Sequence, residues 1–141
     1  MLPSSLKRPS AQNNSVDAQT ATLIAELLNA SSHLHKTHWK ITGPGSYAAH
    51  IALNDFYDAI KAHADSLAEG YQGAEQKLLD IPLVKEEYAC DSVDDALSYL
   101  RELKVKINNL QGVMPHSEIV NELDEAKSSI NTALYKLTFL Q

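Results

Sequence analysis

Imidazole and carboxylate side chains are concentrated in one stretch of this 141-residue sequence. Five of the six histidines fall in a window of about 30 residues: His33, His35, His38, His50 and His63. Asp65 and Glu69 follow and are four residues apart, so they are neighbours on one face of a helix. Mixed imidazole and carboxylate ligands suit first-row divalent metals such as Fe(II), Zn(II) or Mn(II). This stretch is therefore the candidate metal site.

The spacing of two histidines around a chain break predicts that they meet. Gly43-Pro44-Gly45 interrupts two helical patterns, and His38 lies six residues before Pro44 while His50 lies six after it. In an antiparallel helical hairpin, residues equidistant from the turn are level with each other. We therefore expect the two imidazoles to face one another across the hairpin.

The carboxylates are too far along the same helix to join these histidines within one chain. His50 and Asp65 are fifteen residues apart, which is about 22 Å at the helical rise of about 1.5 Å per residue. If His38, His50, Asp65 and Glu69 serve one site, two chains must supply it. A two-fold axis would then create two equal sites per dimer, because an isologous interface repeats every contact.

The elements expected to position these residues are four helices, which makes the fold all-α. Apolar residues recur every three or four positions in four segments. These segments are 17–41, 46–73, 93–111 after a Ser92 cap, and 117 almost to the last residue. The first helix should turn Ala21, Ile24, Leu27, Leu28, Leu34 and Ile41 inward. The same pattern in the other three segments predicts a four-helix bundle.

The expected domain organisation is a polar N-terminal tail over 1–16 and one bundle domain over 17–141. The connection over 74–91 is mixed in composition and has room for one or two helical turns. The segment Pro115-His116-Ser117 offers a second N-cap, at the start of the fourth helix.

Charge and composition exclude several classes of protein. The net charge of −6 argues against a broad nucleic-acid face, so DNA is not an expected partner. No apolar run approaches the roughly 20 residues that span a bilayer, and the first residues lack the apolar core of a signal peptide. Cys90 is the only cysteine and cannot form an internal disulfide. A cytoplasmic location is the simplest expectation.

The chain resembles the Dps family of miniferritins, which belong to the ferritin-like superfamily. The resemblance rests on the run from His38-Trp39 to Gly43, then His50, Tyr57-Asp58, Asp65 and Glu69, at the intervals of the family pattern. It implies a ferritin-like four-helix bundle of the Dps type, with a crossover connection between the second and third helices. It also implies a homo-oligomer, up to a hollow dodecamer.

The resemblance further implies an activity. Dps proteins oxidise Fe(II) with peroxide or oxygen at two-fold interfaces and sequester the iron as a mineral. By carry-over, His38 and His50 are metal ligands of one subunit, and Asp65 and Glu69 are ligands of its partner. Trp39 lies beside the site as an electron donor. The cofactor is then iron, with Zn or Mn as alternatives.

Two positions depart from the family pattern. The family usually has a carboxylate four residues after the second histidine, where this chain has Asn54. An amide oxygen is a poorer ligand and carries no charge to stabilise Fe(III), so ferroxidase activity is expected to be weakened. Gly70 follows Glu69 where the family commonly has Arg.

Two other interpretations stay open. The sequence also resembles small Dps-like proteins encoded by tailed phages, which implies a non-enzymatic oligomeric scaffold with a degenerate metal site. Such a protein would act in the virion or the host cytoplasm, with a phage or host protein as partner. A metal site within one bundle, from Glu26, Asp65 and Glu69, is the second alternative; it lacks the Glu-x-x-His motifs of di-iron bundles.

Overall fold

Four α-helices make up the fold in a computed structural model that describes residues 15–141. They are α1 (Ser15–Lys40), α2 (Ser46–Glu75), α3 (Val93–Gln111) and α4 (Ser117–Phe139). The described residues contain no strand, which confirms the all-helical prediction. The helix α1 begins two residues before the predicted domain boundary, and the rest of the expected tail, 1–14, lies outside the described residues.

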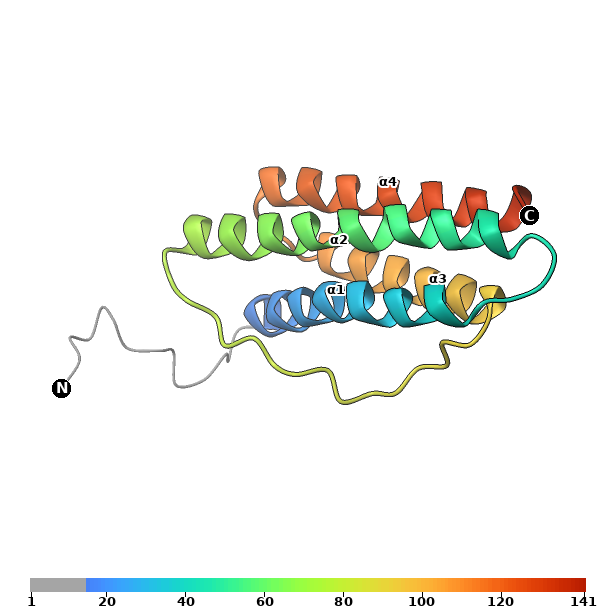
Figure 1. Cartoon of the computed structure of the whole chain (residues 1–141). Coiled ribbons are helices and arrows are strands. Elements are labelled where there is room, and N and C mark those ends of the chain that lie inside the picture. The colour runs from blue at the N-terminus through green and yellow to red at the C-terminus, as the bar shows by residue number, and fades with distance from the viewer. Residues whose placement is uncertain (1–14) are drawn as a thin grey trace.

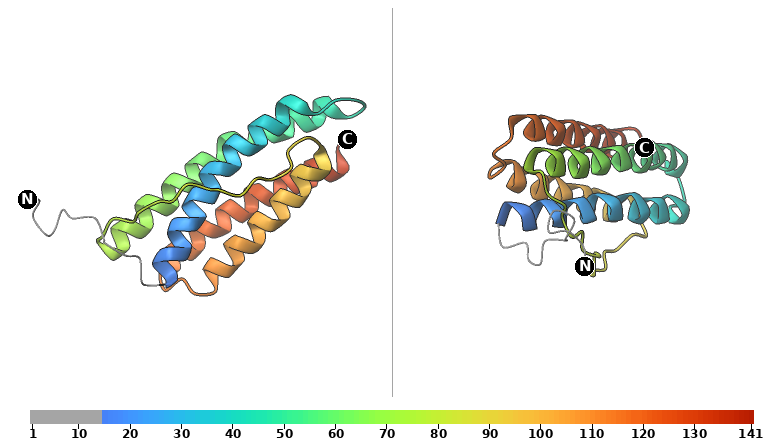
Figure 2. Two further views of the ribbon diagram at one scale, coloured as in Figure 1. Left: turned by 90° about the horizontal axis from the view of Figure 1, so that it is seen from below. Right: turned by 90° about the vertical axis from the view of Figure 1, so that its left-hand side faces the viewer.

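The helices form a bundle in which α1 packs against α2 and α3, and α4 packs against α2 and α3. Figure 1 shows α1 and α2 running in opposite directions, joined at one end of the bundle. Residues 76–92 then return along the length of the bundle, so α3 starts at the end where α2 started (Figure 2). The helix α4 runs back beside α3 and ends near the α1–α2 turn.

The turn between α1 and α2 depends on its two glycines. Gly43 and Gly45 adopt φ values of +91° and +79°, which glycine tolerates because it has no Cβ. A Cβ on Gly45 would also lie 3.2 Å from the main-chain carbon of Gln141, at the end of the described chain. The predicted break is confirmed, and it brings the last turn of α1 beside the first turns of α2.

The predicted inward face of the first helix is confirmed except at one position. Ala21, Ile24, Leu27 and Leu34 are buried, whereas Leu28 is 47% exposed. Leu28 lies about 100° around the helix from Leu27, on the flank of α1, and stays half exposed within residues 15–141. Ile41 lies one residue beyond α1 and is partly buried against the core.

The ends of α3 follow the sequence signals, but the start of α4 does not. The Ser92 side chain caps α3 by accepting a hydrogen bond from the Asp95 main-chain N–H at 3.1 Å, as predicted. His116 occupies the N-cap position of α4 and makes no side-chain cap hydrogen bond, so Ser117 is the first helical residue rather than a cap.

The connection between α2 and α3 contains no helical turn, contrary to the expectation for 74–91. Side-chain contacts hold it in an extended path instead. The Leu79 main-chain N–H donates to Gln72 Oε1 at 2.8 Å, and Asp91 pairs with Lys40 at 2.7 Å. Tyr88 packs its ring edge against Tyr99 of α3. These contacts attach the connection to α2, α1 and α3.

A buried carboxylate ties the start of α1 to the end of α2. Asp17, 5% exposed, accepts a hydrogen bond from the Tyr71 hydroxyl at 2.5 Å and pairs with Lys77 at 2.6 Å. Burial opposes ionisation of Asp17, but hydrogen bonds from Lys77 and Tyr71 outweigh it and lower the pKa of this carboxyl. The ionised form therefore stabilises the fold at neutral pH.

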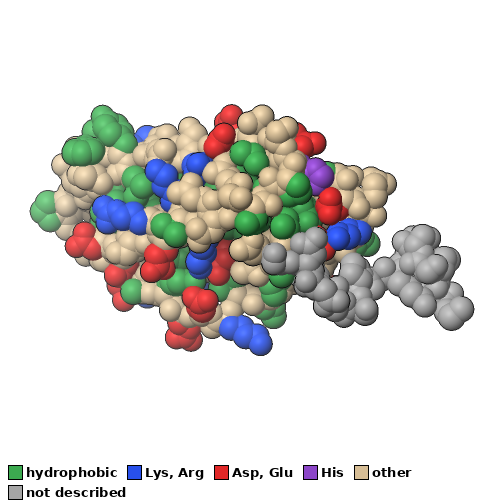
Figure 3. All heavy atoms as spheres, turned by 180° about the vertical axis from the view of Figure 1, so that it is seen from behind, with side chains coloured by type: hydrophobic (Ala, Val, Ile, Leu, Met, Phe, Trp, Pro, Cys, Tyr) green, Lys and Arg blue, Asp and Glu red, His purple; other side chains and the backbone are tan. Residues whose placement is uncertain are grey.

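Within residues 15–141, none of the helices is both long and apolar enough to cross a membrane. Figure 3 shows the face turned away from the viewer of Figure 1, where acidic and basic side chains are interspersed.

Two aromatic side chains of α4, Tyr135 and Phe139, are 55% and 72% exposed, with ring centroids 5.8 Å apart.

Candidate metal centre

His38 and His50 form a stacked pair at the α1–α2 hairpin, as the spacing predicted. Their ring centroids are 3.4 Å apart and the ring planes differ by 19°. The His38 Nδ1 lies 2.8 Å from the main-chain oxygen of His50, and the His50 Nδ1 lies 3.0 Å from the main-chain oxygen of His38. Each imidazole is thus held by the backbone of the other helix.

These two hydrogen bonds assign the tautomer of both rings. A carbonyl oxygen can only accept, so each Nδ1 must carry the proton and donate it. The neutral ring then has its lone pair on Nε2, away from the backbone. A metal-ligating histidine is commonly oriented in this way, with one ring nitrogen donating to a carbonyl and the other binding the metal.

Aromatic rings surround this histidine pair. Tyr57 lies edge-on to His38 at a centroid distance of 5.3 Å. His35 stacks on Tyr57 at 4.1 Å and also contacts Trp39 at 4.3 Å. Trp39 is 68% exposed. The structure therefore places the predicted electron donor, Trp39, against His35 and one ring away from Tyr57.

Asn54 is engaged by its own helix. The Tyr57 hydroxyl donates to Asn54 Oδ1 at 2.6 Å, and the Asn54 amide donates to the Asp58 carboxylate at 3.3 Å. Burial and the charge of Asp58 raise the pKa of Tyr57, so its hydroxyl remains a donor at neutral pH. Sequence analysis missed this role of Tyr57, although its place three residues after Asn54 on a helix could have indicated it.

Asp65 and Glu69 lie on the exposed side of α2. Neither side chain has a hydrogen bond or ion pair within the part of the chain that the structure describes. In the same residues, no three His, Cys, Asp or Glu side chains are close enough to hold a metal together. The structure thus pairs His38 with His50 and does not bring Asp65 or Glu69 to them within one chain.

The intrachain alternative with Glu26 is not what the structure shows. Glu26 is buried and its carboxylate pairs with Lys106 of α3 at 3.2 Å. Lys106 also donates to the Tyr88 hydroxyl at 3.0 Å. The carboxylate therefore faces α3 and the connection, whereas Asp65 and Glu69 are exposed on α2.

Two other histidines have structural contacts. His33 is buried; its ring stacks on Tyr99 at 4.2 Å, and burial lowers its pKa. His63 Nε2 lies 2.8 Å from the Ser129 hydroxyl, which links α2 to α4. Burial lowers the pKa of His63 as well, so the neutral form is favoured.

Gly70 leaves room for the neighbouring helix. A Cβ at this position would lie 3.0 Å from Glu122 Oε2 and 3.0 Å from Ile119 Cδ1 of α4. Close packing against α4 therefore accounts for a residue without a side chain where the family resemblance led us to expect Arg. Burial and the charge of Glu118 raise the pKa of Glu122.

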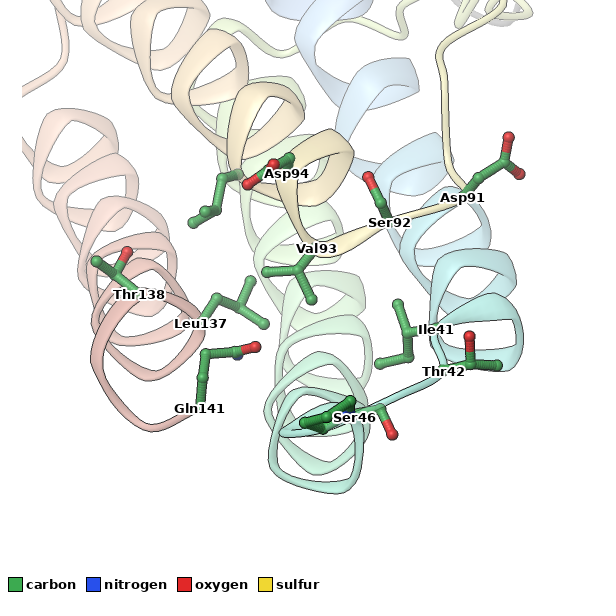
Figure 4. Close-up of a pocket in the computed structure, with 12 residues that line it drawn as sticks. Ile41, Thr42, Ser46, Asp91, Ser92, Val93, Asp94, Leu137, Thr138 and Gln141 are labelled. Atoms are coloured by element: carbon green, nitrogen blue, oxygen red, sulfur yellow. The ribbon is translucent and has the colours of Figure 1, made fainter.

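A pocket lies elsewhere, at the end of the bundle where the α1–α2 turn meets the start of α3 and the end of α4. Its volume is 560 Å³, and Figure 4 shows Asp91 and Asp94 at its rim with Leu137 and Ile41 inside. None of His38, His50, Asn54, Asp65 and Glu69 lines it. It is a gap between helix ends and does not include the candidate ligands.

Exposed apolar side chains flank the histidine pair instead. Trp39 and Tyr47, at the two sides of the hairpin, are 68% and 76% exposed. Ile51, next to His50, is 43% exposed. Exposed apolar surface of this kind is typical of a surface that a partner covers.

One family model matches residues 38–137, which is more than two thirds of the chain. Its description is a family of unknown function, DUF5856. The match begins at His38 and includes His50, Asn54, Asp65 and Glu69. The comparison with curated proteins gives no match.

Proposed function

The chain belongs to this family of unknown function, and we propose that it is a Dps-like iron-binding protein with metal sites shared between two copies. The site takes Fe(II) as substrate, oxidises it with peroxide or oxygen, and the assembly sequesters the product. The fold is ferritin-like, and the assembly is a homodimer or a shell built from such dimers, up to a dodecamer, in the cytoplasm.

The observation that carries the proposal is the orientation of His38 and His50. Both Nδ1 atoms are used by main-chain carbonyls, so both Nε2 lone pairs are left to bind a metal. Two imidazoles leave coordination positions open for carboxylates, water or an oxidant.

The carboxylates come from a second copy in this proposal. Asp65 and Glu69 are exposed and unpaired in residues 15–141, and Asp65 lies about 22 Å along the helix from His50. A two-fold axis beside α2 brings the partner's Asp65 and the partner's Glu69 to His38 and His50. The apolar side chains of Trp39 and Ile51 become covered in the same contact.

The helix order supports a ferritin-like bundle. Such bundles have two antiparallel helix pairs joined by one long crossover connection. Here the connection over 76–92 runs the length of the bundle between α2 and α3 (Figure 1). The candidate ligands all lie on α1 and α2.

The chemistry assigned to the residues follows from charge. Neutral imidazoles bind Fe(II) readily, and the two carboxylates favour Fe(III) because they offset its extra charge. Two Fe(II) ions each lose one electron, and the peroxide O–O bond accepts both electrons. With two protons from solvent this yields two waters. Trp39, in contact with His35, supplies a further electron when iron alone cannot complete the reduction.

The test is complementation between two variants. His38→Ala with His50→Ala removes the imidazole half of the site, and Asp65→Ala with Glu69→Ala removes the carboxylate half. Each variant alone should bind no Fe(II) or Zn(II), as measured by calorimetry on the metal-free protein. Mixed dimers contain one complete site and one empty site, and random exchange makes about half of the dimers mixed, so mixing should restore about a quarter of the wild-type stoichiometry.

The control for this test is a histidine outside the proposed site. His116→Ala removes an imidazole at the α3–α4 turn and should bind metal like the wild type. Binding by either double variant alone would overturn the shared site, since one half would then be sufficient. Absence of binding by the mixture, with dimers present, would do the same.

A second candidate function is a Dps-like scaffold that binds metal without turnover, with a phage or host protein as partner. The engagement of Asn54 by Tyr57 and Asp58 favours it, because this position adds no charge to the site. Aerobic addition of Fe(II) separates the two. Loading of many irons per chain indicates a ferroxidase, and one metal per site indicates the scaffold.

A further inference from the structure

One stripe of polar residues runs along the exposed side of α2, opposite its buried face. The residues that form it recur every three or four positions: His50, Asn54, Asp58, Lys61, Asp65 and Glu69. Lys61, like Asp65 and Glu69, has no hydrogen bond or ion pair within residues 15–141. The one contact in the stripe is the hydrogen bond from Asn54 to Asp58.

The order of charges along this stripe makes it complementary to itself in reverse. From the N-terminal end, the stripe begins with His50 and Asn54 and reaches Asp58 before Lys61. From the C-terminal end, it begins with Glu69 and Asp65 and reaches Lys61 before Asp58. When two copies of one helix pair in an antiparallel way, the residue numbers of any two residues that lie opposite each other add up to the same total. The positions of His50 and Glu69 have the same sum as those of Asp58 and Lys61.

We propose that two copies pair through antiparallel α2 helices in the register that sets Asp58 opposite the partner's Lys61. The inference rests on the shared metal site proposed above, and it fixes which residues meet. The two-fold axis then passes between Asp58 and Lys61. It gives two ion pairs at the centre of the interface and sets His50 opposite the partner's Glu69 at each end.

Neighbouring registers are less favourable because of charge. A shift of one turn in one direction sets Asp58 opposite the partner's Asp65, so like charges meet. A shift of one turn in the other direction sets Lys61 opposite the partner's Asn54 and leaves Asp58 without a cation. Only the proposed register satisfies Asp58 and Lys61 together.

The ion pairs act on register and partner choice more than on affinity. Exposed ion pairs of this kind contribute little to affinity, whereas like charges in the same place repel. The apolar surface of Trp39, Tyr47 and Ile51 supplies the driving force for association. Residues close to the two-fold axis stay in contact at any crossing angle of the two helices. The pair of Asp58 and the partner's Lys61 therefore reports the register.

The test uses charge reversal and mixing, measured by sedimentation of the metal-free protein. Lys61→Glu sets Glu opposite the partner's Asp58, and Asp58→Lys sets Lys opposite the partner's Lys61. Each variant alone should dimerise at least about tenfold more weakly than the wild type, because two attractions become two repulsions. Mixed in equal amounts, the two variants should form heterodimers of near wild-type affinity, since both contacts are complementary again.

Controls separate this effect from net charge and from folding. Asp58→Lys with Lys61→Glu in one chain keeps the net charge and should restore the homodimer. Arg101→Glu makes the same charge change as Lys61→Glu on an exposed position of α3 and should leave the dimer unchanged. Circular dichroism of each variant reports whether α2 remains helical.

The outcomes distinguish this inference from the shared metal site. If dimers form but neither single reversal weakens them, or if mixing does not rescue, the register is wrong even where metal complementation succeeds. If the charge-reversal results hold while the wild-type protein binds no Fe(II) or Zn(II), the register stands and the metal site falls. A wild-type chain that stays monomeric with and without Zn(II) overturns both.

Discussion

His38 and His50 each donate an Nδ1 hydrogen bond to the main-chain carbonyl of the other, across distances of 2.8 and 3.0 Å. The reciprocal arrangement locks two rings of different helices in one orientation. It holds them before any metal is present, so little ordering is left for binding to cost.

Both rings should be Nδ1-protonated neutral tautomers in the metal-free protein at a pH where they are uncharged. Long-range ¹⁵N–¹H correlation spectra distinguish a protonated nitrogen from a bare one. We expect both Nε2 signals in the unprotonated range and both to shift on addition of Zn(II). In His50→Ala, the main-chain carbonyl of residue 50 remains, so the His38 ring should keep this tautomer; its loss there would contradict the hydrogen bond from His38 Nδ1 to that carbonyl.

Trp39 reports on the interface because it is the only tryptophan. It is 68% exposed in the single chain, so the monomer should emit as a solvated indole. Dimer formation should shift its emission to shorter wavelengths, since the proposed interface covers it. Emission that stays constant across a dimerisation measured by sedimentation would place the interface away from α1 and α2.

Asn54→Asp should raise the rate of Fe(II) oxidation by peroxide, on the order of tenfold, because it adds a charged ligand to the site. The Tyr57 hydroxyl can donate to the new carboxylate as it does to the amide. Stopped-flow absorbance of Fe(III) gives the rate. Asn54→Gln is the matched control and should show no gain; equal rates for Asp and Gln would mean that charge at this position does not limit oxidation.

Asp17→Asn should cost stability at neutral pH and less in acid. The pKa of Asp17 is lowered in the folded state from an ordinary value of 3.8. The contribution of its charge is therefore present in full above that value and is lost as the pH falls through the folded-state pKa. Denaturant unfolding should show a loss of about 1–3 kcal/mol at neutral pH.

The control for this pH dependence is Asp65→Asn. Asp65 is exposed and unpaired in the described residues, so its removal should change the free energy of unfolding little at any pH. If the difference between wild type and Asp17→Asn stayed constant down to the acid range, the contacts of Asp17 with Tyr71 and Lys77 would not depend on its charge.

Leu100→Ala should destabilise the single chain by about 2–5 kcal/mol, since Leu100 is fully buried in α3 and its loss leaves a cavity. Leu28→Ala should change the stability of the monomer by less than about 0.5 kcal/mol because Leu28 is half exposed. Chemical denaturation of a dilute sample provides both values. A large loss for Leu28→Ala in the monomer would mean that its own chain covers it.

Much of the fold could be predicted because helical periodicity is a local signal. Apolar spacing located all four helices to within a few residues, and Ser92 marked the start of α3. The connection was harder, since its path depends on distant partners such as Lys40 for Asp91 and Tyr99 for Tyr88. Leu28 was misplaced for the same reason, as periodicity alone does not say which flank a neighbour covers.

The meeting of His38 and His50, and the separation of both from Asp65, followed from the sequence by itself. A helix has a fixed rise and a two-helix turn fixes which residues are level, so counting residues was sufficient. Only the tertiary structure decided that the two rings hold each other through main-chain carbonyls, that Tyr57 and Asp58 engage Asn54, and that Glu26 faces Lys106. Those contacts depend on rotamers and on packing between helices, which residue spacing along one chain does not specify.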